Sequence, residues 1–173
     1  MQKARLAASA YNLERDMHVV EKCLENLQAA YGRGQSKLAQ AAEQALVTLT
    51  DLYCTSPEVI RFRIIHVLAD FPIEQVRQLL EQALDADESS LVRHEAASGL
   101  GMMGDSSTIE LLISAVKDDP SYLVRHEAAL ALESIGDETA FPALEQGLND
   151  DNPEVVISCQ VALSSIRYRI EAR

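Results

Sequence analysis

Apolar and polar residues do not alternate with a period of two anywhere along this chain, so the pattern predicts no strand. Most of the chain is rich in Ala, Leu, Glu and Gln, which favour helices. The seven glycines and five prolines lie mainly at the boundaries between these helix-favouring segments. The pattern therefore predicts an all-α protein. Nine helices are expected, over residues 3–31, 36–53, 58–69, 72–84, 90–103, 106–117, 122–135, 138–148 and 153–171.

Part of this pattern is repeated. The seven residues LVRHEAA occupy positions 91–97 and again 123–129, a step of 32, and a Gly-Asp pair at 104–105 recurs at 136–137 with the same step. Residues 59–65 upstream and 155–163 downstream keep the hydrophobic outline. Paired helices with a period near 32 residues predict a right-handed α-solenoid. We expect a repeat domain over residues 56–173 and an N-terminal helical extension or cap over residues 1–55.

One repeat unit illustrates the expected packing. In the helix from residue 90, Val92, Ala96, Leu100 and Met103 project to one side and should form the core stripe. The small residues Ala96 and Gly99 should let neighbouring helices approach closely. The Gly-Asp pair should end one helix and start the next, because Gly can adopt a positive φ and Asp can cap the following amides.

The composition narrows the protein class. A chain of 173 residues with 47% hydrophobic residues can bury one sizeable core. It has no apolar run of membrane-spanning length and no secretion signal, which favours a cytoplasmic protein. Cys23, Cys54 and Cys159 lack the spacing of zinc or redox sites and are expected to be small buried residues.

The charge is strongly acidic. Lys and Arg number 15 against 27 for Asp and Glu, giving a net charge of −12. Nucleic acid and anionic membrane surfaces are therefore poor partners. A basic protein or a cationic, lysine-derived substrate fits better, and the alternative is that the acidity only maintains solubility.

Two His-Glu pairs are the candidate chemistry. His94-Glu95 and His126-Glu127 lie at the same position of adjacent repeats, outside the predicted core stripe. Equivalent helices of stacked repeats lie about 10 Å apart, so two imidazoles and two carboxylates could share one surface. This ligand mixture suits iron, zinc or manganese. The competing interpretation is an ordinary duplicated surface motif that binds no metal.

The VRHEAA motif, the Gly-Asp turn and the 32-residue step resemble the HEAT-like repeats of the deoxyhypusine hydroxylase family, over residues 57–170. In that family, His-Glu pairs on successive repeats bind two irons. The resemblance implies that His94, Glu95, His126 and Glu127 are iron ligands, and that the iron pair activates dioxygen as in a monooxygenase. The family substrate is a modified lysine on a translation initiation factor. More distantly, the repeats resemble those of phycobilin lyases.

The sequence departs from that family in the number of pairs. The family has four His-Glu pairs in two halves of one chain, and this chain has two. Phe62-Arg63 and Ile157-Ser158 stand at the equivalent positions of the flanking repeats. A homodimer would restore four pairs about a twofold axis, with the two irons at its interface. The alternatives are a non-catalytic HEAT-repeat interaction scaffold and a phycobilin-lyase-like protein.

Overall fold

The computed structural model describes the backbone of residues 2–33 and 36–172, and the side chains of residues 12–30 and 40–172. All regular structure in these ranges is helical, which confirms the all-α prediction. The helices are α1 (Gln2–Arg33), α2 (Ser36–Thr55), α3 (Glu58–Leu68), α4 (Glu74–Ala86), α5 (Ser90–Met103), α6 (Ile109–Asp118), α7 (Tyr122–Ile135), α8 (Phe141–Gly147) and α9 (Pro153–Glu171).

The predicted bounds agree with these helices to within a few residues. Helices α5, α7 and α9 begin and end where the sequence places them. Helices α6 and α8 differ, because a 3₁₀ turn (Ser106–Thr108 and Glu138–Ala140) precedes each of them. Helix α4 begins at Glu74, two residues after the predicted start at Pro72. Helix α1 extends to Arg33, two residues beyond the predicted end at residue 31.

The chain divides into two compact units, Met1–Val67 and Leu68–Arg173. In the first unit, α1 and α2 pack against each other. Val20, Leu27 and Leu49 are buried there, and an exposed Arg63–Glu21 ion pair joins α3 to α1, with Nη2 2.7 Å from Oε1. One expectation is wrong in this unit: Cys23 is buried, but Cys54 is exposed near the end of α2.

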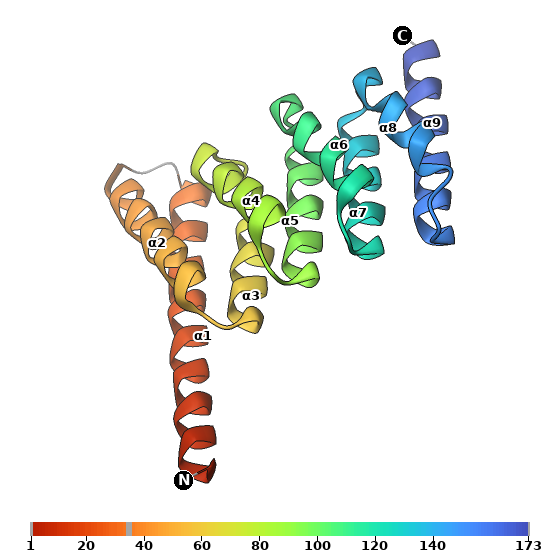
Figure 1. Ribbon diagram of the computed structural model, residues 1–173. Coiled ribbons are helices and arrows are strands. Elements are labelled where there is room, and N and C mark those ends of the chain that lie inside the picture. Colours follow the sequence, from red (N-terminus) through yellow and green to blue (C-terminus); the bar gives the residue numbers. More distant parts are fainter. Residues whose placement is uncertain (1, 34–35, 173) are drawn as a thin grey trace. The chain divides into compact units, whose positions relative to one another are not determined.

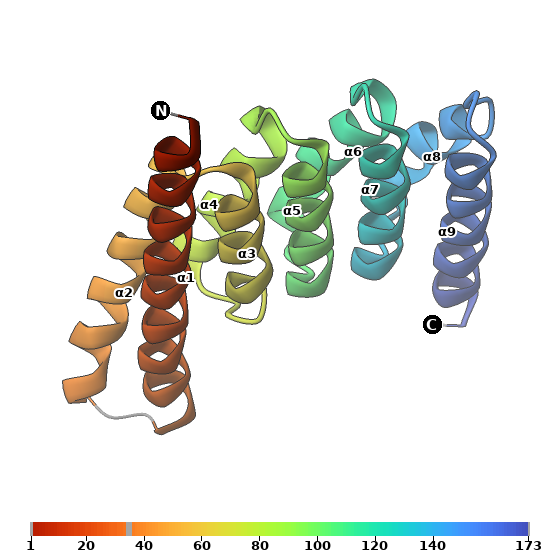
Figure 2. The ribbon, with the colours of Figure 1, turned by 90° about the horizontal axis from the view of Figure 1, so that it is seen from below.

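The second unit consists of two rows of helices. Helices α5, α7 and α9 lie side by side in one row, and α4, α6 and α8 form the other (Figures 1 and 2). Val92, Ala96 and Leu100 are fully buried between the rows, as the core stripe predicted, although Met103 is only half-buried. Each helix buries one side and exposes the other, so the row α5–α7–α9 presents a continuous outer face. We call it the first-helix face, because α5, α7 and α9 are each the first helix of a repeat.

The Gly-Asp turns behave as predicted. Gly104 and Gly136 adopt left-handed conformations, with φ of 66° and 77°. The Asp105 carboxylate accepts a hydrogen bond from the Ser107 amide at 2.9 Å, and Asp137 does the same for Thr139 at 2.9 Å. The positive φ ends one helix, and the aspartate satisfies a free amide at the start of the next turn.

Two glycines of α5 also let neighbouring parts of the chain pack closely against this helix. A Cβ built on Gly99 would lie 3.0 Å from the Ala69 Cβ, which confirms the predicted close approach. The sequence interpretation missed a second such position, Gly101, where a Cβ would lie 2.7 Å from the Ala131 Cα in α7. Helices α5 and α7 are therefore in near-backbone contact at this point.

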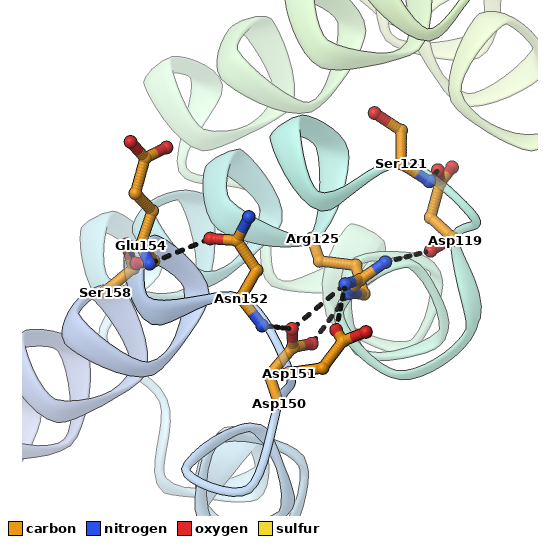
Figure 3. Close-up of polar contacts among 8 residues, drawn as sticks. All are labelled: Asp119, Ser121, Arg125, Asp150, Asp151, Asn152, Glu154 and Ser158. Carbon is orange, nitrogen blue, oxygen red and sulfur yellow. Dashed lines mark hydrogen bonds and ion pairs between the residues drawn. The ribbon is translucent and has the colours of Figure 1, made fainter.

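A chain of arginine–aspartate contacts joins successive repeats. Arg93 on α5 binds the Asp119 carboxylate through Nε at 2.7 Å and Nη2 at 2.9 Å. Arg125 on α7 binds the Asp150 carboxylate at the same two distances, and its Nη1 donates to the Asp119 carbonyl at 2.9 Å (Figure 3). Asp119 and Asp150 lie in the connections between repeats, and these contacts hold consecutive repeats together.

Candidate metal site

The four predicted ligands lie on the first-helix face. His94 and Glu95 are on α5, His126 and Glu127 are on α7, and all four are half-buried. Successive helical residues differ by about 100° in direction, so a histidine two residues after a buried valine points away from the core. Val92 and Val124 occupy those buried positions. The predicted separation of the His-Glu pairs from the core stripe is therefore present.

The structure brings together His94 and Glu127, which belong to different pairs. The His94 Nε2 atom lies 3.4 Å from the Glu127 Oε2 atom, with side chains 32% and 16% exposed. The hydrogen bond to Glu127 raises the pKa of His94, against the effect of burial. The same contact lowers the pKa of Glu127. The two groups therefore stabilise each other's charged forms.

His126 has a different partner. Its Nδ1 atom lies 2.6 Å from the hydroxyl oxygen of Ser158 on α9, and that hydroxyl donates to the Glu154 carbonyl at 2.8 Å. The side chain of Ser158 is buried. The sequence interpretation placed Ser158 at a position equivalent to the glutamate of a pair but assigned it no contact with a histidine.

Both contacts follow one rule of register. Helix α7 begins 32 residues after α5, and α9 begins 31 residues after α7. With these offsets, Ile157-Ser158 in α9 occupy the positions of His126-Glu127 in α7. The histidine of each repeat therefore contacts the second residue of the next repeat's pair: His94 contacts Glu127, and His126 contacts Ser158.

The donors available in one chain are few. Among the side chains that the structure describes, those of residues 12–30 and 40–172, no three His, Cys, Asp or Glu are grouped so that they could hold a metal ion. The separation of the His94 and Glu127 donor atoms nevertheless suits a shared ion. Two ligands about 2.0–2.2 Å from one ion, at tetrahedral or octahedral angles, lie about 2.8–3.6 Å apart. One chain thus presents two suitable donors.

Exposed apolar side chains lie on α9, the next helix of the row. Ile157 is 57% exposed and Tyr168 is 73% exposed, and both lie on α9 together with the exposed Val161. Ile157 holds the position in α9 that His126 holds in α7. The first-helix face therefore passes from the His-Glu donors on α5 and α7 to an apolar row on α9, which consists of Ile157, Val161 and Tyr168.

Comparison with protein-family models gives a match over residues 78–164, to the family described as HEAT repeats. This match begins within α4 and ends within α9. The chain belongs to the HEAT repeat family. The predicted HEAT-like α-solenoid is thereby confirmed, and the 32-residue period is the HEAT repeat of this chain. No curated protein matches the chain.

Two solved structures share the fold of this chain. Human deoxyhypusine hydroxylase in complex with glycerol is 30% identical, with a TM-score of 0.67, over 78% of this chain and 47% of that chain. This chain therefore spans about half the length of that hydroxylase. A designed armadillo repeat protein is 22% identical, with a TM-score of 0.55, over 75% of this chain and 68% of that one, and supports the fold alone.

No helix in the described part of the chain is long and apolar enough to cross a membrane.

Proposed function

We propose that this HEAT repeat protein binds a pair of metal ions, iron in the first instance, at a site completed by a second copy of the chain. The observation that carries the proposal is the His94–Glu127 contact across adjacent repeats, at a separation of 3.4 Å that suits two ligands of one ion. Imidazole and carboxylate together form a suitable donor set for iron, zinc or manganese.

The proposed ligands from each protomer are His126, Glu95 and the His94–Glu127 pair. A dinuclear site needs more donors than the two that one chain brings into contact, and a twofold axis would double the set. The apolar row on α9 supports this arrangement, because exposed Ile157 and Tyr168 on the same face offer surface that a second copy could bury.

The resemblance to deoxyhypusine hydroxylase suggests the chemistry. A bound iron pair would activate dioxygen for hydroxylation of an aliphatic carbon. This chain's own residues would bind the metal through two imidazoles and two carboxylates per protomer. Its net charge of −12 favours a cationic substrate, such as a lysine-derived side chain or a basic protein.

A non-catalytic HEAT-repeat scaffold is the second candidate. It is favoured by the lack of any three-donor cluster among the residues that the structure describes. In that case the His94–Glu127 contact would be an ion pair, and the first-helix face would bind a protein partner. The structure offers no specific observation for a phycobilin-lyase-like function.

Metal analysis distinguishes the two candidates. Protein purified from iron-supplemented cells should contain about one iron per chain if the ligand set of each protomer serves one ion. His94→Ala and Glu127→Gln should each abolish most of this content. The matched control is His18→Ala, which removes an exposed imidazole from α1. Metal-free wild-type protein would leave only the scaffold function.

The oligomeric state provides the second test. Light scattering after gel filtration should show a dimer of metal-replete wild-type protein. Ile157→Glu should give a monomer with less bound metal, because it places a charge in the apolar row. The control is Val47→Glu, which introduces the same charge at an exposed apolar position on α2. A metal-replete monomer would contradict the shared site.

A further inference from the structure

The contact between His126 and Ser158 differs in kind from the contact between His94 and Glu127. Ser158 offers a neutral hydroxyl, with only 3% of the residue exposed, where the preceding repeat offers a carboxylate. Its oxygen lies 2.6 Å from His126 Nδ1 and 2.8 Å from the Glu154 carbonyl oxygen. Both distances are those of hydrogen bonds.

The number of hydrogens on each group shows which atom donates and which accepts in this contact. A serine hydroxyl carries one hydrogen, and a backbone carbonyl can only accept. The Ser158 hydrogen goes to the Glu154 carbonyl, so the Ser158 oxygen acts as acceptor toward His126. The hydrogen between the two side chains is then the one on Nδ1. In a neutral imidazole with its hydrogen on Nδ1, the lone pair for coordination is on Nε2.

The burial of Ser158 makes this orientation persistent. Water has little access to compete for the hydroxyl, and the α9 backbone fixes the accepting carbonyl one turn before the serine. A hydrogen bond from a neighbouring group to one ring nitrogen is a general means of selecting which nitrogen binds a metal ion.

We infer that Ser158 is a positioning residue that holds His126 as the Nδ1–H tautomer, so that Nε2 is the nitrogen offered to a metal ion. This inference rests on the proposed function for its metal partner, but the tautomer itself is a property of the metal-free protein. The inference gives a role to Ser158, although its repeat lacks a His-Glu pair. The repeat of α9 contributes to the site through a hydrogen bond to a ligand of the preceding repeat.

The first measurement is made on metal-free protein. Long-range ¹H–¹⁵N NMR spectra, recorded at a pH high enough to keep imidazoles neutral, distinguish a protonated Nδ1 from a protonated Nε2. Wild-type His126 should be protonated at Nδ1. In Ser158→Ala the ring should shift toward the Nε2–H form, which an unconstrained histidine side chain favours.

The second measurement is the affinity for Co²⁺, a spectroscopically visible substitute for iron. Removal of the hydrogen-bond partner of a metal ligand typically weakens metal binding by about 10–100-fold, and we expect that loss in Ser158→Ala. The matched control is Ser164→Ala on the same helix. Ser164 is exposed and also donates to a carbonyl four residues earlier, that of Gln160, at 2.8 Å. Its loss should change neither the tautomer nor the affinity.

The outcomes separate the two proposals. A wild-type His126 protonated at Nε2 would overturn the role of Ser158 whether or not metal binds. An unchanged Co²⁺ affinity in Ser158→Ala would overturn it as well. Failure of the wild-type protein to bind Co²⁺ or iron would instead overturn the proposed metal function, while the NMR spectra would still show whether Ser158 selects the tautomer.

Discussion

The junction of α5 with α7 and the junction of α7 with α9 are built from nearly the same sequence motif, yet they differ at the histidine. Arg93 and Arg125 bind Asp119 and Asp150 with identical distances of 2.7 and 2.9 Å. The histidine that follows each arginine meets Glu127 in one junction and Ser158 in the other. A duplicated motif therefore reproduces a contact only where the next repeat has kept the partner.

Removal of either arginine should have the largest effect on stability. The Arg93–Asp119 side chains are 11% and 8% exposed, and those of Arg125–Asp150 are 13% and 10% exposed. Arg93→Met and Arg125→Met would each leave a poorly solvated carboxylate without its partner. Each should lower the free energy of unfolding by about 3 kcal/mol, measured by urea denaturation.

The control for the arginine variants is Arg167→Met, which breaks a pair whose side chains are 54% and 55% exposed. That change should cost less than about 1 kcal/mol. Clearly unequal losses for Arg93→Met and Arg125→Met would show that the two junctions are not energetically equivalent.

Gly101→Ala should destabilise the junction of α5 with α7 and leave the junction of α7 with α9 unaffected. The added methyl group would lie 2.7 Å from the Ala131 Cα, which belongs to the backbone of α7 and cannot move aside easily. We expect a loss of about 1–3 kcal/mol, although Gly→Ala in a helix normally stabilises. Thermal unfolding would measure it, with exposed Met102→Ala as the control. A stabilised Gly101→Ala protein would refute the near-backbone contact.

Acid should weaken the second junction through Asp150. Hydrogen bonds from Arg125 hold the pKa of Asp150 below its ordinary value of 3.8 in the folded protein. The contribution of this carboxylate is therefore fully present above about pH 4 and is lost as pH falls through the lowered pKa. A thermal melting series from pH 6 to pH 2 should fall less steeply for Arg125→Met than for the wild-type protein. Parallel curves would contradict the coupling.

The smallest effect concerns the His94–Glu127 pair. In metal-free protein, an NMR titration should give His94 a pKa above its ordinary value of 6.5. Glu127→Gln should lower this pKa, and Glu95→Gln should lower it less, because Glu127 also forms a hydrogen bond. Since the pKa is raised in the folded state, the stabilisation, about 0.5 kcal/mol, is present below pH 6.5 and lost above the raised pKa.

Much of the fold could be predicted from the sequence. The helix-forming composition and the Gly-Asp turns are local signals, because each depends on contacts within one or two turns of the chain. The 32-residue step is read directly from the recurrence of the motif in the sequence. The starts of α6 and α8 were less accurate, because the same turn residues can begin a 3₁₀ turn or an α-helix. Helix α4 starts later than predicted because Ile73 is still extended. The exposed Cys54 shows a similar limit, since the burial of a single cysteine depends on which face of α2 meets α1.

The candidate site could be predicted only in part. The sequence singled out His94, Glu95, His126 and Glu127, and it predicted that they lie outside the core stripe. It could not show that His94 pairs with Glu127 instead of the adjacent Glu95. Neighbours in a helical sequence point about 100° apart, while residues on parallel helices meet according to the offset between repeats.

The sequence by itself thus determined the helices, their period and the residue types on each face, because these follow from local propensity and from the spacing of apolar positions. Only the tertiary structure decided which side chains meet. The contacts of Gly101 with Ala131 and of His126 with Ser158 join different helices, and the contact of Arg93 with Asp119 joins α5 to the connection between α6 and α7. Each depends on how far one helix of the row is shifted along its neighbour, and a shift of one residue would change all three.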